Sequence, residues 1–370
     1  MKNSGKNRNN YNFIFLVDLP DPVHGMSNVN HSVLSEALSR GIKPVVINTA
    51  PSYAASFYGK RLWGVIKFCH SFVCALRLFF YLVLCSESVV YRPINGGLGQ
   101  VYDFGYIILC KIFGSKILIH HHSFNYLNNR RWFFKVLNQL GGKESIHIVL
   151  GARMKEKLIE LYGIYPEKIH ILSNIAFFSG NRSIPFQENR PIVVGHLANL
   201  CVEKGIGDFI ALCEALSSKG YEFRAHIAGP YTDLKSKEII GNVISKLPQV
   251  KYLGPLYGAD KDSFFQGLDI FVFPSHYCNE AEPLVLYEAA QFGVLNLGTR
   301  RGCMASVIKS LGGISFDERG VVTQMANAIS DLEQAGSLGL EAREERVTRF
   351  LEEKARGSKA LDKLFELMVG

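Results

Sequence analysis

Short apolar runs of strand length alternate with longer stretches of helical period from one end of the chain to the other. This alternation is typical of parallel sheets, because two parallel strands need a crossover connection, usually a helix, between them. We therefore predict an α/β protein. The predicted strands cover residues 13–18, 43–49, 88–92, 115–121, 146–151, 168–174, 191–197, 222–229, 250–254 and 269–273.

The length predicts two domains, since single hydrophobic cores stop growing near about 250 residues and this chain has 370. The periodicity is interrupted between Ile175 and Arg190 by a polar passage rich in Ser, Gly, Asn and Pro. We place the boundary there, with domains at 1–180 and 181–350. The last segment, 351–370, has the composition of a helix, and we expect it to pack back toward the first domain.

The cysteines indicate the cellular compartment of the protein, and the net charge indicates its partners. The eight cysteines lie inside apolar runs without zinc-ligand spacing, and the polar N-terminus lacks the apolar core of a secretory signal, which together predict a cytoplasmic protein. A net charge of +8 suits anionic substrates, membrane surfaces or nucleic acid. No arginine-rich tract or aromatic RNA-binding signature is present, so we do not expect nucleic acid as a partner.

One apolar run, from Leu62 to Cys85, is long enough to cross a membrane. It carries Lys67, His70 and Arg77, each of which is costly at bilayer depth. The sequence therefore favours a buried or interfacial helix over a membrane span, and we expect peripheral association with an anionic membrane.

Residues 273–290 read FPSHYCNEAEPLVLYEAA and place three acids, Glu280, Glu282 and Glu288, around an expected helix start. We expect Pro283 in the first turn, where its missing N–H costs nothing. The backbone N–H groups near Leu284 and Val285 would then form an anion site suited to phosphate.

The acids have two interpretations. They can simply complement the helix dipole, and for Glu282 we expect only that, or contact with solvent. Alternatively, Glu280 and Glu288 flank a bound phosphate and must face its neutral attachments, because carboxylates repel phosphate. The hydroxyls of a ribose and of a second sugar are suitable donors, and a nucleotide sugar carries both.

The motif Glu280, seven residues, Glu288 resembles the signature of retaining glycosyltransferases of the large sucrose-synthase-like family, glycosyltransferase family 4, group 1. The stretch VVGHLANLCVEKGIGDFI, residues 193–210, resembles the family's strand, loop and helix. In it, Lys204 stands at the phosphate-binding lysine, and Asn199 replaces the usual arginine. The resemblance implies the GT-B fold, two Rossmann-like doubly wound domains facing across a cleft, with C-terminal helices crossing back.

Other loops resemble the family's ligand-side loops. HIAGP (226–230), YLGPLYG (252–258) and GTRRGC (298–303) resemble those on the nucleotide side. The resemblance places Gly229 at the nucleotide and Gly254, Pro255 and Leu256 near its base. PDPVHGMSNVNHSVLSEALSRG (20–41) is similar to the first loop and helix, where Gly25 and Met26 would approach the donor phosphates and the acceptor.

Three histidines end the predicted strand at 115–121. Alternation along a strand puts His120 and His122 on one face and His121 on the other, so the three cannot converge on one metal ion. The family has a histidine near the transferred sugar at the end of this strand, and we assign that role to His122, with His120 second. The DxD string at Asp260 and Asp262 opens a predicted helix, and we interpret it as a helix cap.

These observations lead to one functional prediction. The protein is expected to move a sugar from a nucleoside diphosphate sugar onto a glycan, lipid-linked or other acceptor, with retention, in bacterial surface polysaccharide synthesis at the cytoplasmic face of the membrane. His122, Glu280 and Lys204 would be catalytic, Glu288 would hold the ribose, and no metal or other cofactor is expected. The alternatives are an epimerase or phosphorylase on the same fold, or a non-catalytic polysaccharide-binding protein, which Asn199 favours.

Overall fold

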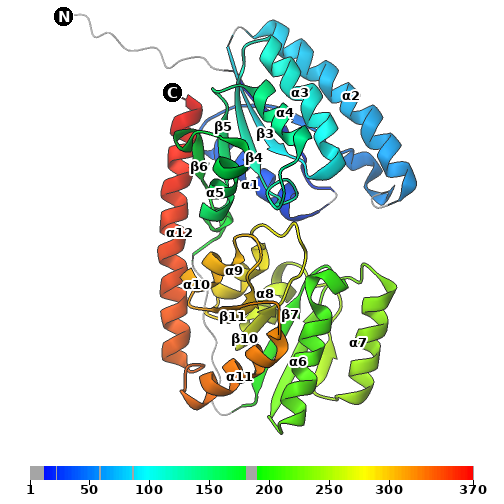
Figure 1. The fold of residues 1–370 in the computed structure, drawn as a ribbon, viewed down its shortest axis with the longest axis vertical. Helices are drawn as coiled ribbons and strands as arrows, with labels where there is room; N and C mark the ends of the chain where they lie inside the picture. The colour runs from blue at the N-terminus through cyan, green and yellow to red at the C-terminus, as the bar shows by residue number, and fades with distance from the viewer. Residues whose placement is uncertain (1–11, 22, 58–59, 86, 181–189, 370) are drawn as a thin grey trace, which may run out of the picture. The chain divides into compact units, whose positions relative to one another are not determined.

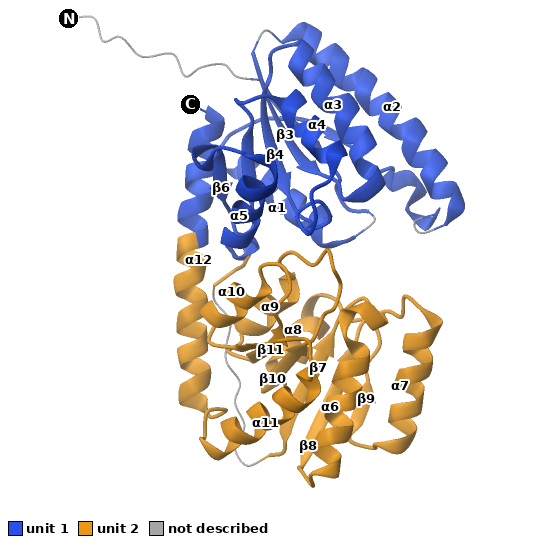
Figure 2. Ribbon diagram, in the orientation of Figure 1, with its two compact units in different colours: residues 1–177, 357–370 blue, residues 178–356 orange. Residues whose placement is uncertain are grey.

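The computed structural model describes residues 12–21, 23–57, 60–85, 87–180 and 190–369. The chain forms two compact units, shown in separate colours in Figure 2. Unit 1 contains residues 1–177 and 357–370, and unit 2 contains residues 178–356. Figure 1 shows the helices and strands of both units.

The sheet of unit 1 has six parallel strands in the order β2-β1-β3-β4-β5-β6. The strand order reverses between β1 and β3, and ligands of such sheets bind outside the carboxyl ends of the strands at this point. The strands are β1 (Asn12–Val17), β2 (Val45–Asn48), β3 (Ser88–Ile94), β4 (Lys116–His121), β5 (Ile146–Val149) and β6 (Ile169–Ile171).

Five helices of unit 1 follow its strands: α1 (Gly25–Ser39), α2 (Arg61–Leu84), α3 (Gln100–Ile112), α4 (Trp132–Gly141) and α5 (Ala152–Tyr162). Short 3-10 turns lie at Ser52–Phe57, Gly97–Gly99, Pro166–Lys168 and Asn174–Phe177. Helix α3 packs against both α2 and α4, so α2 lies at the margin of this group (Figure 1).

Unit 2 repeats the same plan with a six-stranded parallel sheet in the order β12-β11-β10-β7-β8-β9, which reverses between β7 and β10. The strands are β7 (Ile192–Leu197), β8 (Phe223–Ala228), β9 (Val250–Tyr252), β10 (Ile270–Phe273), β11 (Leu295–Thr299) and β12 (Ile314–Phe316). Its helices are η5 (Val202–Lys204), α6 (Ile206–Ser218), α7 (Leu234–Lys246), α8 (Gly258–Gln266), α9 (Leu284–Ala290), α10 (Met304–Ser310) and α11 (Val321–Gln334).

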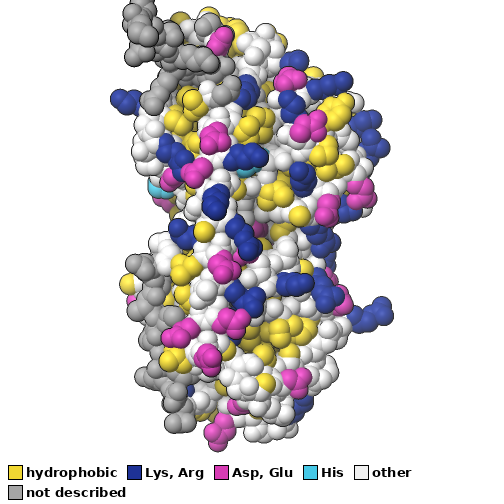
Figure 3. All heavy atoms as spheres, turned by 90° about the vertical axis from the view of Figure 1, so that its left-hand side faces the viewer, with side chains coloured by type: hydrophobic (Ala, Val, Ile, Leu, Met, Phe, Trp, Pro, Cys, Tyr) yellow, Lys and Arg dark blue, Asp and Glu magenta, His cyan; other side chains and the backbone are white. Residues whose placement is uncertain are grey.

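The last helix, α12 (Leu340–Val369), contributes residues to both units. Within unit 2 its buried Arg343 donates to the carbonyl of Phe292 at 2.9 Å. Within unit 1 Asp362 pairs with Arg40 of α1 at 2.6 Å. On the face in view in Figure 3, acidic and basic side chains are interspersed, so the net charge of +8 does not form a single-sign stripe there.

The prediction of an α/β protein with two Rossmann-like domains is confirmed. The units divide at 177/178 and 356/357, compared with the expected 180/181 and 350/351. The expected linker segment 181–189 lies outside the described residues.

Candidate active site

Two of the predicted catalytic residues meet at the carboxyl ends of neighbouring strands in unit 2. Lys204 ends η5, which follows β7, and Glu280 lies in the loop after β10; β7 and β10 are paired. The Lys204 Nζ is 2.6 Å from Oε2 of Glu280, and the same oxygen accepts a hydrogen bond from Ser275 Oγ at 3.0 Å. An ammonium group has three donors, so this pair leaves lysine donors for a ligand.

Two glycines let the backbone close around this pair. Gly205, directly after Lys204, has φ of +85°, and a Cβ there would lie 2.1 Å from the carbonyl oxygen of Pro274. Gly302 has φ of +48°, and its Cβ would lie 2.1 Å from the carbonyl oxygen of Glu280. Only glycine fits at either position, so close backbone contacts hold the loops that carry Lys204 and Glu280.

Glu288 lies on α9, the helix that follows the loop of Glu280. Its Oε1 is 2.6 Å from Lys261 Nζ of α8, whereas its buried Oε2 has no hydrogen-bond partner among the described residues. Burial raises the pKa of Glu288, and the Lys261 charge opposes that shift. A buried acceptor without a donor is unusual in a folded protein and marks a place where a ligand hydroxyl can bind.

Two details of this region differ from expectation. Pro283 is the N-cap of α9 rather than its first residue, and Leu284 and Val285, both half-buried, form the first turn. Glu282 was expected to face solvent or only to complement the helix dipole, and the solvent-facing alternative was wrong. It is buried, and its Oε1 accepts a hydrogen bond from Tyr287 Oη at 2.7 Å, because the buried tyrosine supplies an inward-facing donor.

The interpretation of Asp260 as a helix cap was also wrong. Helix α8 begins at Gly258, after Tyr257, and has no side-chain cap. Gly258 adopts φ of +51°, which lets the chain turn into the helix two residues earlier. No group of three or more His, Cys, Asp or Glu side chains suited to a metal ion occurs within the described ranges.

The residues expected around the base lie at the carboxyl edge of β7, β8 and β9. Gly229 has φ of +119°, and a Cβ there would lie 1.8 Å from the carbonyl oxygen of Ala198. The Gly229 N–H donates to the carbonyl of Gly254 at 2.9 Å, which joins the two loops. Asn199 and Pro255 are exposed, and Leu256 is half-buried.

In unit 1, the side chains of His120 at the end of β4 and of His122 just after it lie on the same side, as predicted. Their ring centroids are 4.0 Å apart, while His121 points the other way and contacts Tyr126 and His147. Tyr91 Oη and His120 Nδ1 are 2.5 Å apart. Burial, with a smaller effect from His24, lowers the pKa of His122 to about 3, so the ring is neutral near pH 7.

The second ring nitrogen of His122 is available to a ligand. Nε2 is buried and has no hydrogen-bond partner in the part of the chain that the structure describes. A neutral imidazole with one free nitrogen can donate to or accept from a sugar hydroxyl, depending on its tautomer.

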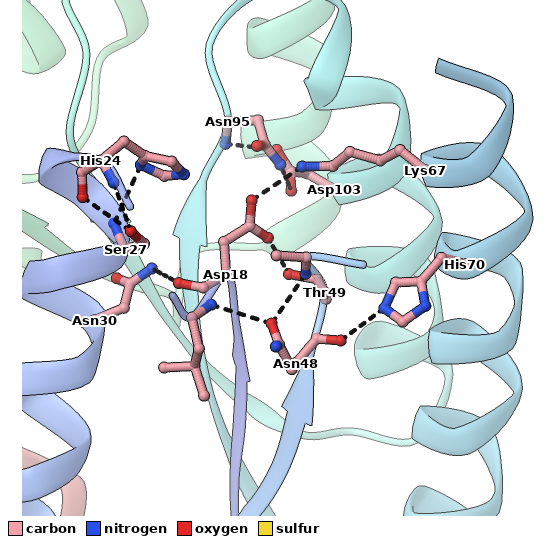
Figure 4. A network of polar contacts seen from close by, with 12 residues as sticks. Asp18, His24, Ser27, Asn30, Asn48, Thr49, Lys67, His70, Asn95 and Asp103 are labelled. Carbon is pink, nitrogen blue, oxygen red and sulfur yellow. Dashed lines mark hydrogen bonds and ion pairs between the residues drawn. The ribbon is translucent and has the colours of Figure 1, made fainter. Parts of the chain in front are cut away.

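A buried charge network, which the sequence did not predict, lies at the carboxyl edge of β1, β2 and β3 (Figure 4). Asp18, directly after β1, contacts Thr49 Oγ1 and lies 3.0 Å from Lys67 Nζ of α2. Arg92 lies 2.6 Å from Asp103 and donates to Thr49 Oγ1 at 2.9 Å. Burial raises the pKa of Asp18, but the charges of Lys67 and Arg92 outweigh it, and the net shift is downward. The network thus carries two positive and two negative groups.

A cavity of ≈190 Å³ opens beside this network at the point where the strand order reverses. It is lined by Asp18, His24, Met26, Ala50, Trp63, Lys67 and Asn95. Met26, for which the sequence predicts a ligand contact, is thus on the wall of this cavity. Gly25 is the exposed first residue of α1, next to the N-cap His24, whose Nδ1 accepts from the Ser27 N–H at 3.2 Å. Asp18 could have been found from the sequence as an acid at a strand end. Lys67 could not, because it lies inside the apolar run from Leu62 to Cys85.

The geometry of unit 2 agrees with a comparison of sequence families. Residues 180–348 match the family described as Glycosyl transferases group 1. This segment carries Lys204, Glu280 and Glu288. Among curated proteins, none matches the sequence.

Solved structures share the fold at low sequence identity. A glycosyltransferase from Rickettsia africae has a TM-score of 0.72 at 16% identity, covering 97% of this chain and 98% of its own. Anabaena HepE, solved with UDP, has a TM-score of 0.66 at 15% identity, covering 96% and 99%. TarM, known from S. aureus, has a TM-score of 0.63 at 17% identity, and the match covers 80% of this chain but only 58% of TarM. The chain has the GT-B fold, and the family match and the fold together support a glycosyltransferase.

Proposed function

We propose that the protein transfers a sugar from a nucleoside diphosphate sugar to a hydroxyl group of a glycan or lipid-linked acceptor, with retention of the anomeric configuration. The observation that carries this proposal is the arrangement of Lys204, Glu280 and Glu288 on adjacent loops and helices of unit 2. All three lie in the segment that matches the glycosyltransferase family.

Unit 2 would bind the nucleotide part of the donor. The unpartnered Oε2 of Glu288 would accept a ribose hydroxyl, and Gly229 and the loop from Gly254 to Leu256 would line the nucleotide and its base. Lys204 and the first N–H groups of α9 would balance the diphosphate charge. UDP sugars are the first donors to test, because HepE was solved with UDP and with UDP-glucose.

The departing diphosphate would be stabilised without a metal ion. As the bond from the anomeric carbon to the diphosphate breaks, negative charge would grow on the leaving oxygen, and the positive charge of Lys204 would counteract it. Glu280 of unit 2 would hold hydroxyls of the transferred sugar, and a contact of His122 with a sugar hydroxyl stays a prediction from the sequence. The acceptor hydroxyl would attack from the face that the diphosphate leaves, and its proton would pass to the diphosphate.

Unit 1 would bind the acceptor. Its cavity beside Asp18, Lys67 and Asn95 offers both donors and acceptors, and its charges are balanced, which suits an uncharged hydroxylated group such as a sugar. We further propose that this reaction belongs to bacterial surface polysaccharide synthesis at the cytoplasmic face of the membrane.

A donor screen tests the proposal. The protein is incubated with UDP, GDP, ADP and CMP sugars, and release of the free nucleotide is measured with and without glycan acceptors. We expect one donor to release its nucleotide only when an acceptor is present. NMR of the product should show the same anomeric configuration as in the donor. Free epimerised sugar, or a requirement for inorganic phosphate, would indicate a different reaction on this fold. Binding of a glycan without any nucleotide release would indicate a non-catalytic protein.

A further inference from the structure

Helix α2 has an apolar face that the described residues of unit 1 leave largely exposed. Of the described chain, it is the one helix long and apolar enough to cross a membrane by length and composition, yet only 22% of its most apolar window is buried. We call its exposed apolar residues the outer face, and three phenylalanines in it, Phe68, Phe72 and Phe80, are each more than 60% exposed. The outer face comprises Leu62, Val65, Phe68, Phe72, Val73, Leu76, Phe79, Phe80, Val83 and Leu84.

The opposite side of the same helix is fixed to unit 1. Ser71, Cys74, Leu78 and Leu82 recur at helical spacing and are buried. Lys67 reaches Asp18, and His70 Nε2 lies 3.0 Å from the carbonyl oxygen of Asn48, as Figure 4 shows. A membrane span would break these contacts and expose a buried carboxylate, so the helix stays on unit 1 and meets an apolar phase only with its outer face.

The charges around the outer face fit an anionic surface. Helix α2 contains no acidic residue, and Arg61 and Arg77 on it are exposed. Lys60 immediately precedes the helix. Lys111 of α3 is exposed two residues before Phe113, whose ring lies 5.7 Å from that of Phe79. Apolar side chains flanked by basic ones are typical of helices that lie in the headgroup region of a bilayer.

We propose that the outer face of α2 docks into the headgroup region of an anionic lipid bilayer, and that the acceptor is carried by a membrane lipid. The second part rests on the proposed glycosyl transfer. It follows from the same helix, because Trp63 and Lys67 of α2 line the unit 1 cavity. Docking of α2 therefore places the acceptor cavity at the membrane surface, where a lipid-borne sugar can enter it.

Vesicle flotation tests the docking. The protein should float with phosphatidylcholine vesicles containing about one-third phosphatidylglycerol at low salt, and less with phosphatidylcholine alone or at high salt. The variant F68S/F72S/F80S should lose at least tenfold of the bound fraction. Leu234→Ser, at a side chain of α7 that is 86% exposed in unit 2, is the matched control and should float like the wild type. A wild-type protein that stays at the bottom, or a triple variant that floats normally, overturns the docking.

Four further measurements distinguish membrane docking from misfolding and from dimer formation. Unchanged circular dichroism and UDP affinity of the triple variant show that it is folded. Hydrogen exchange should slow in residues 61–84 when vesicles are added, and peptides of α7 should not change. A dimer in solution that the triple variant abolishes, with no vesicle binding, would show instead that a second copy covers the outer face.

The lipid-borne acceptor is tested with a labelled donor and vesicles made from the lipids of the source cells. We expect label in the organic phase. The triple variant should reduce this label at least tenfold and leave hydrolysis of the donor by water unchanged. Label confined to water-soluble glycan overturns this part of the inference. Flotation without turnover of any donor would contradict the proposed function and leave the docking intact.

Discussion

Lys204 pairs with the carboxylate of Glu280, and in the proposed reaction it also has to bind the diphosphate. The lysine holds a carboxylate at 2.6 Å, which keeps its side chain in place, and in the proposed reaction its remaining donors would bind the diphosphate. The lysine can bind both groups at once because its ammonium has three donors, and the diphosphate carries more negative charge than one carboxylate. Its effect should be largest when charge develops on the leaving oxygen, because an interaction that strengthens in the transition state raises the rate.

Lys204→Ala should therefore lower turnover more than donor affinity. Loss of one preorganised donor at a developing oxyanion costs about a hundredfold or more in kcat. We expect that loss with a change in donor Kd of less than about tenfold, measured by steady-state kinetics and by titration. Lys157→Ala removes a lysine from an exposed pair with Glu160 and should change neither quantity. Equal effects on kcat and Kd would contradict a role in the departure of the diphosphate.

Glu288→Ala should weaken binding of the nucleotide. A hydrogen bond to a charged acceptor is worth about 1.5–3 kcal/mol, which corresponds to at least a tenfold rise in the Kd of UDP by calorimetry. Exposed Glu238 supplies the control, since Glu238→Ala should leave Kd unchanged. Glu282→Ala should affect stability instead, because Glu282 is buried. Loss of the acceptor for Tyr287 should lower the free energy of unfolding by about 1–3 kcal/mol while UDP affinity stays within about twofold. An unchanged Kd for Glu288→Ala would mean that the ribose binds elsewhere.

At the scale of elements, strands β4 and β5 bury a row of neutral histidines in unit 1. Burial lowers the pKa of His147 to about 4, and it lowers the pKa of His120 and His121 as well. His121 Nε2 and His147 Nδ1 are 3.0 Å apart, so at least one ring must be neutral for the contact to persist. Protonation of this row is therefore coupled to unfolding.

The stability of the protein should fall as pH decreases from about 6.5 to 4. In this window the histidines of the unfolded chain bind protons, whereas the buried histidines of the folded protein stay neutral. The free energy of unfolding therefore drops by about 1.4 kcal/mol per pH unit for each such histidine. His147→Gln should reduce this slope by about one proton, measured by denaturant unfolding at several pH values. A slope identical to that of the wild type would show that His147 is not neutral in the fold.

The elements show what the sequence could and could not predict. All ten predicted strands are present, because most of them are apolar runs that are largely buried. Strands β11 and β12 were not predicted, since LNLGT and ISF are too short and too rich in Gly, Ser and Asn to stand out. The motif residues of unit 2 were found through a fixed spacing within one segment. The contact of Lys67 with Asp18 joins residues 49 positions apart, and nothing local to either residue signals it.

At the scale of the whole molecule, α12 completes the cores of both units. Its residues up to 356 belong to unit 2, and Arg343 and Arg346 there donate to the carbonyls of Phe292 and Gly293. Its residues from 357 belong to unit 1, where Lys116 Nζ donates to the carbonyl of Leu367 at 2.6 Å. Unit 1 therefore reaches its full core only when the end of the chain is in place.

Leu364→Ala should destabilise unit 1 without weakening UDP binding by unit 2. Leu364 is fully buried, and removal of a buried leucine side chain costs about 2–5 kcal/mol because it leaves a cavity. Leu351, on the same helix but 41% exposed, supplies the matched control, and Leu351→Ala should cost no more than about 0.5 kcal/mol. Denaturant unfolding, followed by hydrogen exchange of peptides from each unit, measures where the loss occurs. We expect faster exchange in β4 to β6 and an unchanged UDP Kd, because the residues proposed to bind the base and the ribose, together with Lys204, lie in unit 2. If Leu364→Ala weakens UDP binding as much as Glu288→Ala does, the nucleotide site depends on unit 1 and its assignment to unit 2 alone is wrong.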